Sequence, residues 1–239
     1  MTEIARGVSI LNADPEALAQ LFERATESGE LRVMNSQFYR EFPQEQLSAF
    51  AHQLGAYCLP TNGLIDLLDK LILEASPSRS AIEIGAGNGI IGRALGIPCT
   101  DNRMQERMDI KALYKASGQP VVRYGDHVQK LNAREAVLHC KPEVVVAAWV
   151  THIYNPAEHW RGGNAFGVDE AAMLKKIKRY IFVGHRSPHQ FKPLLDLEPR
   201  EIVDPCLFSR SMDASGNVIW VWDNPDYQRD AKHDPEYLS

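Results

Sequence analysis

Apolar residues recur at helical spacing through the first third of the chain, which predicts helices before any strand. Asp14 is suited to cap a helix that begins at Pro15, because its carboxylate accepts from free backbone N–H groups and proline has no N–H to lose there. The apolar positions that follow at intervals of three or four are Leu18, Leu21, Phe22 and Ala25. Gly29 then predicts the end of this helix.

Two more helices are predicted before residue 75. One begins at Pro43 and ends before Gly55, and its apolar face consists of Leu47, Phe50, Ala51 and Leu54. The other runs from Asn62 to about Glu74, and its apolar positions are Leu64, Ile65, Leu67, Leu68, Leu71 and Ile72. The chain therefore opens with a helical segment.

From residue 81 the pattern changes to short apolar runs separated by helical segments. The runs lie at residues 81–84, 97–100, 121–131, 144–148 and 180–183. Such alternation is typical of a parallel sheet with crossover helices. At the end of the chain the runs CLFSRS and NVIWVW are joined by the turn-like MDASG, which predicts two antiparallel strands in a hairpin.

These elements predict an α/β protein with a Rossmann-like, doubly wound and mostly parallel sheet, an antiparallel C-terminal hairpin strand and a helical N-terminal extension. We expect the extension to cover residues 1–75 and to pack on the core. The sheet domain is expected to cover residues 76–225, and residues 226–239 form a tail. The sequence has no internal repeat or low-complexity tract that favours a further domain.

Composition narrows the classes of function. The 239 residues are 44% hydrophobic, yet no apolar run approaches the roughly 20 residues that cross a bilayer. The first residues lack the pattern of a secretory signal, so we expect a cytoplasmic protein without a membrane partner. The four cysteines are far apart, which predicts neither a disulfide framework nor a zinc site. A net charge of −5 makes nucleic acid a disfavoured partner. The basic run KKIKR at 175–179 keeps nucleic-acid binding as an alternative.

The stretch AIEIGAGNGIIGRALG, residues 81–96, carries the most specific chemistry. Glycines permit positive φ and close approach of a ligand to the backbone, and the helix that follows offers free N–H groups. A phosphate-binding P-loop requires GxxxxGK followed by Ser or Thr. This stretch has Arg93 and no such lysine, so a P-loop is disfavoured. A dinucleotide fingerprint is disfavoured because Ile90 lies where the third glycine of GxGxxG belongs. A purely structural turn is the plain alternative.

This string, Glu83 followed by glycines at 85, 87 and 89, resembles motif I of class I S-adenosylmethionine-dependent methyltransferases. The resemblance covers residues 57–222 as an order of elements, and the family's sheet ends with an antiparallel strand inserted beside the parallel ones. It implies that the loop of Gly85, Ala86, Gly87, Asn88 and Gly89 packs against the methionine and ribose part of S-adenosylmethionine (SAM). Glu83 is then expected near the ammonium group, directly or through water.

The resemblance also implies an acid after the second strand, where its two oxygens accept from the ribose hydroxyls. Asp101 matches by position, with Asn102 beside it, although its spacing from Gly85 is short for the family. Asp126 and Asn132 compete as the contact to the adenine amino group. Each has an ordinary alternative: Asp101 and Asp126 as turn or capping residues, Asn132 as a helix N-cap.

Substrate-side residues are expected after the fourth and fifth strands, since ligands bind beyond the carboxyl ends of parallel strands. Trp149 and His152 follow the fourth, and His185 follows the fifth with Arg186 and His189 nearby. We expect Trp149 beside the donor and its acceptor, and His152 or His185 to deprotonate or orient the acceptor. Core packing for Trp149 and structural hydrogen bonds for the histidines are the alternatives.

The resulting hypothesis is an enzyme of the EC 2.1.1 class that transfers a methyl group from SAM to an unidentified small molecule, nucleic acid or protein. A non-catalytic SAM-binding regulatory or scaffold protein is the first alternative, because the fourth strand lacks the Asp/Asn-Pro-Pro-Tyr/Trp signature of base amino-methyltransferases. An NAD-dependent oxidoreductase is the weaker one. No metal is expected, and the sequence does not give the oligomeric state.

Overall fold

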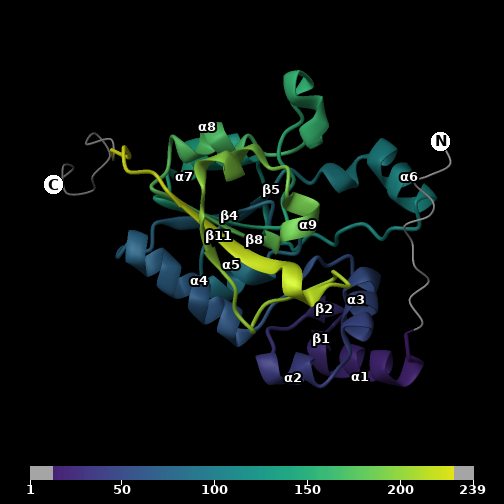
Figure 1. Cartoon of the computed structure of the whole chain (residues 1–239). Coiled ribbons are helices and arrows are strands. Elements are labelled where there is room, and N and C mark those ends of the chain that lie inside the picture. Colours follow the sequence, from purple (N-terminus) through teal and green to yellow (C-terminus); the bar gives the residue numbers. More distant parts are fainter. Residues whose placement is uncertain (1–12, 229–239) are drawn as a thin grey trace.

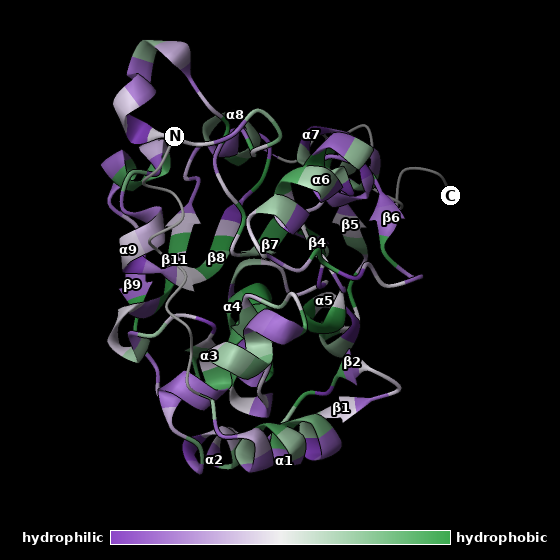
Figure 2. Cartoon of the chain, turned by 90° about the vertical axis from the view of Figure 1, so that its right-hand side faces the viewer, coloured by the Kyte–Doolittle hydropathy of each residue, from purple (hydrophilic) through white to green (hydrophobic). Residues whose placement is uncertain are grey.

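The computed structural model describes residues 13–228, so most of the expected C-terminal tail lies outside the described residues. Its centre is a seven-stranded sheet in the order β6-β5-β4-β7-β8-β11-β9, which can be followed strand by strand in Figure 2. The strands are β4 (Ala81–Ile84), β5 (Cys99–Asp101), β6 (Gln129–Lys130), β7 (Val144–Ala148), β8 (Arg179–His185), β9 (Arg200–Ile202) and β11 (Asn217–Asp223).

Strands β6, β5, β4, β7 and β8 pair in parallel, and β11 runs antiparallel to β8 on one side and to β9 on the other. A mostly parallel sheet with helices on both faces confirms the predicted Rossmann-like α/β class. The five connections between the parallel strands and β11 include α5 (Ile90–Leu95), α7 (Ala133–Cys140), α8 (Glu170–Leu174) and α9 (Arg186–His189).

The sequence predicts that residues 206–211 pair with the last strand as a hairpin, and this prediction is wrong. Strand β10 (Phe208–Ser209) leaves the sheet and pairs with β3 (Cys58–Leu59) of the N-terminal segment. Strand β11 has six buried residues in succession, so both of its faces need cover and both of its edges need a strand. One edge of β11 pairs with β8 along its whole length, and the other edge pairs with β9.

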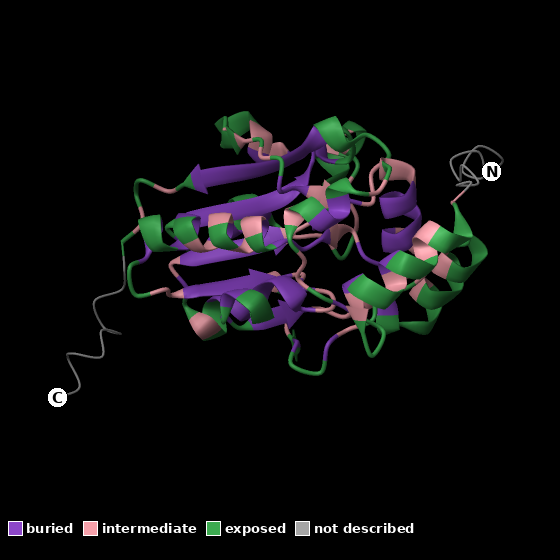
Figure 3. Ribbon diagram, turned by 90° about the horizontal axis from the view of Figure 1, so that it is seen from below, coloured by how far each residue is buried: buried purple, intermediate pink, exposed green. Residues whose placement is uncertain are grey.

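The two faces of the sheet have separate cores, as the alternation of side chains along a strand requires. Val144 and Val146 of β7 belong to the core beneath α4 and α5, whereas Val145 and Ala147 belong to the core beneath α7 and α8. Figure 3 shows the strands as a buried layer between helices with exposed outer faces. The strands read as continuous apolar runs because both faces are covered.

The N-terminal segment forms α1 (Pro15–Ala25), α2 (Ser36–Arg40), α3 (Gln44–Gln53) and α4 (Asn62–Ala75), which lie on one face of the molecule in Figure 1. Asp14 caps α1 through Glu16 N–H, and α3 and α4 begin where the sequence predicts. Gly29 does not end α1. It sits with φ 79° in the turn between two short strands, β1 (Thr26–Glu27) and β2 (Glu30–Leu31), which the sequence analysis did not predict.

The apolar run at 121–131 forms a strand only at β6. Residues 102–128, which we call the strap, contain the 3-10 turn Met104–Glu106, helix α6 (Met108–Ala116) and an extended return. Val122 N–H donates to the Gln105 side chain at 2.7 Å instead of to a neighbouring strand. Figures 1 and 2 place α6 beyond the carboxyl ends of the parallel strands, so the strap covers that edge of the sheet.

Short 3-10 segments complete the fold at Pro156–Arg161, Pro193–Leu197 and Ala214–Gly216. Within residues 13–228, no helix combines the length and apolarity needed to span a membrane. Over the same residues, histidines, cysteines and acids form no group of three or more able to hold a metal ion.

Candidate functional site

The carboxyl ends of β4, β5, β7 and β8 meet at one edge of the sheet, where ligands of this fold class bind. The turn after β4 carries positive φ at each of its glycines: 57° at Gly85, 56° at Gly87 and 71° at Gly89. Ala86 N–H bonds the Thr100 carbonyl at 3.0 Å, which ties the turn to β5. The Asn88 side chain bonds the start of α5, because its Oδ1 accepts from Ile90 N–H at 3.1 Å.

Side chains of this chain already pack against the glycines. A Cβ on Gly89 would lie 2.5 Å from His127 Nε2, and one on Gly87 would lie 3.2 Å from Val122 Cγ1. A Cβ on Gly85 would collide with Val150. The turn therefore requires glycine for internal packing as well as for φ, and the strap supplies two of its three neighbours.

Glu83 is 2% exposed and points beneath α5. Its Oε2 accepts from Gly92 N–H at 2.8 Å, and a Cβ on Gly92 would press on the same carboxyl group. Burial raises the pKa of Glu83 to about 8, opposed by the Gly92 hydrogen bond and reinforced by the nearby Asp101. This contact fastens α5 to the end of β4, and the side chain does not open onto the surface.

Asp101 lies at the end of β5 and faces the glycine turn. Its Oδ2 accepts from Gly87 N–H at 2.9 Å, and its Oδ1 accepts from Arg103 N–H at 2.7 Å. Burial raises the pKa of Asp101, while both backbone hydrogen bonds oppose the rise. A carboxylate has about four acceptor positions, so two of them stay available for a hydroxyl-bearing ligand.

The other residues predicted to contact SAM make local contacts or are exposed in this structure. Asn102 joins two loops, because its Nδ2 donates to the Phe166 carbonyl at 3.1 Å. Asn132 is exposed and forms a capping box with Glu135 at the start of α7, so the N-cap alternative describes its role here. Asp126 is exposed in the turn before β6.

Trp149 follows β7 with φ 59°, an uncommon conformation for a large side chain. Its N–H bonds the Val183 carbonyl at 2.8 Å, which holds the strand end against β8. The ring is half-buried, and its centroid lies 5.8 Å from that of Tyr57 and 5.1 Å from that of His189. Backbone strain of this kind gathers at functional sites.

His185 is 2% exposed and has both ring nitrogens engaged. Nδ1 accepts from Ser187 N–H at 3.2 Å, so the proton is on Nε2, 2.6 Å from the Asp213 carbonyl oxygen. The imidazole caps α9 and ties it to the loop before β11. In this arrangement no unprotonated nitrogen of His185 is free to act on an acceptor as the predicted base.

His152 differs, because its Nε2 is buried and has no hydrogen-bond partner among the described residues. Burial lowers the pKa of His152, and the nearby Lys192 lowers it further. The ring is wrapped by the loop that follows, with a Cβ on Gly163 falling 3.0 Å from Nε2. The imidazole is thus held neutral with one acceptor nitrogen, although only 9% of the residue is exposed.

Beside this histidine lies a buried polar cluster that the sequence analysis missed. Lys192 is 0% exposed, and its Nζ donates to Glu170 Oε1 at 2.7 Å. Tyr180 OH donates to the same oxygen at 2.7 Å, while Glu170 Oε2 has no partner among the described residues. A lone lysine and a lone glutamate 22 residues apart give no signal in sequence, since such residues are exposed in most proteins.

The chemistry of the strand ends fits SAM in part. The Asp101 carboxylate suits a cationic ligand with ribose hydroxyls, because two of its acceptor positions have no partner among the described residues, although Asp101 is only 9% exposed. Gly85 and Gly87 are partly exposed, so their backbone is accessible beside Asp101. Glu83 makes no hydrogen bond to such a ligand in this arrangement, since its carboxyl group lies beneath α5 and accepts from Gly92 N–H.

Comparisons with known proteins give two weak structural matches and no match in sequence. No family model matches the chain, and no curated protein matches it. One similar solved structure is SMU.776, provisionally assigned as a methyltransferase and complexed with SAH: 6% identity, TM-score 0.32, covering 65% of this chain and 48% of that one. The chain thus spans about half of that protein's length. Another is the mitomycin 7-O-methyltransferase MmcR, with 14% identity and a TM-score of 0.32. The match covers 90% of this chain and 70% of that one. Likeness this low carries no functional weight.

Proposed function

We propose that the protein is a SAM-dependent methyltransferase. The observation that carries the proposal is the sheet order, with one reversed strand, β11, inserted between β8 and β9 beside five parallel strands. The resemblance drawn from the glycine motif implies that arrangement, and all-parallel dinucleotide-binding sheets lack it. Motif and sheet order are independent of each other, and they agree.

Asp101 is the residue we assign to the ribose hydroxyls, and the backbone of Gly85 and Gly87 is assigned to the amino-acid part of SAM. When bound, SAM supplies a methyl group that its sulfonium already activates. The protein then needs chiefly to align the acceptor with that methyl group, because orientation supplies most of the rate gain. Trp149 is our candidate for that alignment, since it is half-buried and rigidly held at the end of β7.

Calorimetric titration with SAM and S-adenosylhomocysteine tests the donor. We expect both to bind and Asp101→Asn to weaken them at least tenfold, because an amide can no longer offer two anionic oxygens, and hydrogen bonds to charged groups contribute about 1.5–3 kcal/mol each. Asp109→Asn, on the exposed side of α6, is the matched control. A folded protein with affinity for neither compound contradicts the proposal.

A second candidate, a non-catalytic SAM-binding protein, draws support from the histidines. His185 has no free nitrogen and His152 is nearly buried, so neither of these two histidines presents an accessible base to an acceptor that must lose a proton. Transfer of a labelled methyl group to nucleic-acid, protein or metabolite pools separates the two. Binding without any labelled acceptor favours the second candidate, whereas labelling that persists in His152→Ala removes the histidine from the mechanism.

A further inference from the structure

A cavity of about 240 Å³ lies beside the glycine turn, and Asn88 and Ile90 form part of its lining. Four segments far apart in the sequence line it: the β1–β2 turn, the end of α3, the start of α5 and residues 121–123 of the strap. One water needs only about 10–15 Å³, and sites for drug-sized ligands begin near 300 Å³. The cavity therefore suits a single small molecule.

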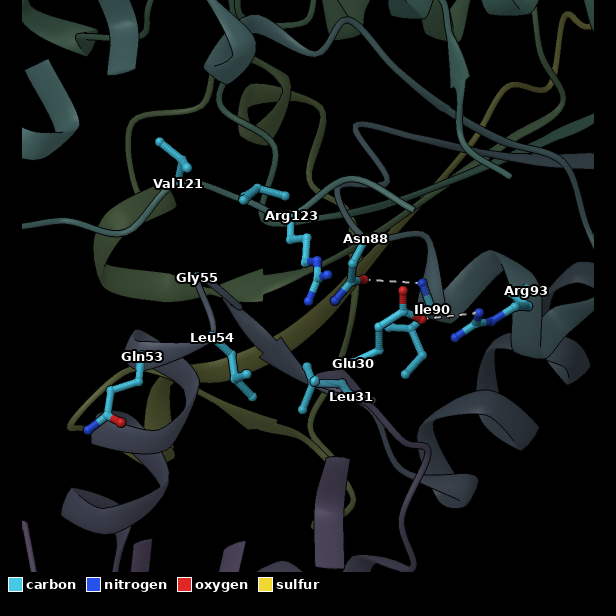
Figure 4. A pocket seen from close by; sticks show the side chains of 12 residues that line it. Glu30, Leu31, Gln53, Leu54, Gly55, Asn88, Ile90, Arg93, Val121 and Arg123 are labelled. Carbon is cyan, nitrogen blue, oxygen red and sulfur yellow. Dashed lines mark hydrogen bonds and ion pairs between the residues drawn. The ribbon is translucent and has the colours of Figure 1, made fainter. Parts of the chain in front are cut away.

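Its polar side chains are two cations, Arg93 and Arg123, one anion, Glu30, and two amides, Asn88 and Gln53. Arg93 and Glu30 form an ion pair at 3.5 Å with both side chains about half exposed. Arg123 has no hydrogen-bond or ion-pair partner among the described residues, and its Nη1 lies near the β1–β2 turn, 3.2 Å from where a Cβ on Gly29 would be. Figure 4 shows the heads of Arg123, Asn88 and Glu30 converging on one side of the cavity.

The rest of the lining is apolar. Leu31 and Ile90 are buried, and Leu54 and Val122 are half-buried around the same space. A guanidinium without a partner attracts a carboxylate, and a glutamate beside it attracts an ammonium, so the two complement a zwitterion. The apolar wall complements a short hydrocarbon or thioether side chain.

We propose that this cavity binds the zwitterionic end of an apolar α-amino acid, with the carboxylate on Arg123 and the ammonium facing Glu30. The ligand is either a free amino acid or the amino-acid end of the methyl donor, and the second source rests on the proposed function. Asn88 belongs to the glycine turn, lines the cavity and accepts from Ile90 N–H at the start of α5, so an occupant touches the turn itself.

The test is calorimetric titration of the full chain with L-methionine, L-leucine, SAM, S-adenosylhomocysteine and 5′-methylthioadenosine, which lacks the amino-acid end. Arg123→Gln is compared with Arg123→Lys, which keeps the charge, and with Arg134→Gln, an exposed arginine outside the cavity. We expect Arg123→Gln to weaken the carboxylate-bearing ligand at least tenfold. Arg123→Lys restores part of the affinity, and Arg134→Gln changes nothing.

The ligands separate the two sources. Loss of methionine or leucine binding in Arg123→Gln identifies a free amino acid. Loss confined to SAM and S-adenosylhomocysteine, with 5′-methylthioadenosine unaffected, identifies the donor. Equal affinity of Arg123→Gln and the parent chain for every carboxylate-bearing probe overturns the cavity proposal, as does the absence of binding by all of them. Arg123-dependent amino-acid binding without SAM binding overturns the methyltransferase proposal alone.

Discussion

Glu83 illustrates how one buried residue can serve the fold and a ligand at once. Its carboxyl group accepts from Gly92 N–H, which fixes α5 over the end of β4. Burial raises its pKa to about 8, so at neutral pH the Glu83 carboxyl group is protonated in most folded molecules. A cationic ligand beside Asp101 would favour ionisation of Glu83 through the same electrostatic coupling.

That pKa gives a prediction about stability. Between pH 4.5 and 8 the unfolded chain releases the Glu83 proton while the folded chain retains it, so this group lowers stability as pH rises. Glu83→Gln removes the effect and keeps an acceptor for Gly92. We expect its free energy of unfolding, relative to the parent chain, to rise by about 3 kcal/mol from pH 5 to 7.5, measured by urea denaturation. Glu23→Gln, on the exposed face of α1, is the control. Identical pH slopes for Glu83→Gln and the parent chain would contradict the raised pKa.

Polar residues that the sequence marks as functional often cap helices instead. Asn132 caps α7 and His185 caps α9, and Asn88 accepts from the first N–H group of α5. Sequence alone does not separate the two roles, because a cap and a ligand contact both need a short polar side chain at the junction of a loop and a helix. The sequence predicted that these polar residues lie where a loop meets a helix. It did not predict which group each side chain bonds.

At the level of elements, α8 is attached through the buried Lys192–Glu170 pair. Lys192→Met should destabilise the protein by about 3–5 kcal/mol in urea denaturation, because it leaves the Glu170 carboxylate buried without its counter-ion. The double variant Lys192→Met, Glu170→Gln should recover most of that loss, since no charge is then buried. A double variant no more stable than the single one would indicate that the lysine stabilises mainly by packing.

Helix α6 is the opposite kind of element, because none of its residues is buried. Met108 is 79% and Leu113 63% exposed, so the helix has little apolar burial to stabilise it. Amide hydrogens in α6 should therefore exchange faster, by at least tenfold, than those in α7, which buries Ala136 and Val137. Hydrogen exchange followed by mass spectrometry measures this. Equal protection of the two helices would mean that the strap is anchored by contacts outside α6.

Across the whole molecule, the N-terminal segment and the sheet share one core. Leu21 and Phe50 of the segment belong to the same buried cluster as Val146 and Ile219 of the sheet. The pairing of β10 with β3 joins the two again near the other end of the chain. Residues 13–75 are thus packed against the sheet through buried apolar contacts.

Shared burial predicts cooperative unfolding. The full chain should give a single calorimetric transition, with the calorimetric and van't Hoff enthalpies agreeing, because neither part can lose its partner without exposing core side chains. Two resolved transitions, or an enthalpy ratio well above one, would show that the N-terminal segment unfolds independently.

Local rules in the sequence determined the elements. The cap and proline at residues 14–15 start α1, and the uninterrupted apolar run at 144–148 forms a strand buried on both faces. They also located the glycine turn and the acid after β5, since chain order fixes which strand each residue follows. Tertiary structure alone decided the partners. It paired β10 with β3, turned residues 121–128 into part of the strap, engaged both nitrogens of His185, and brought four distant segments around one cavity. The physical reason is that helix caps and strand patterns depend on neighbours in sequence, whereas strand pairing, burial and pocket lining depend on neighbours in space.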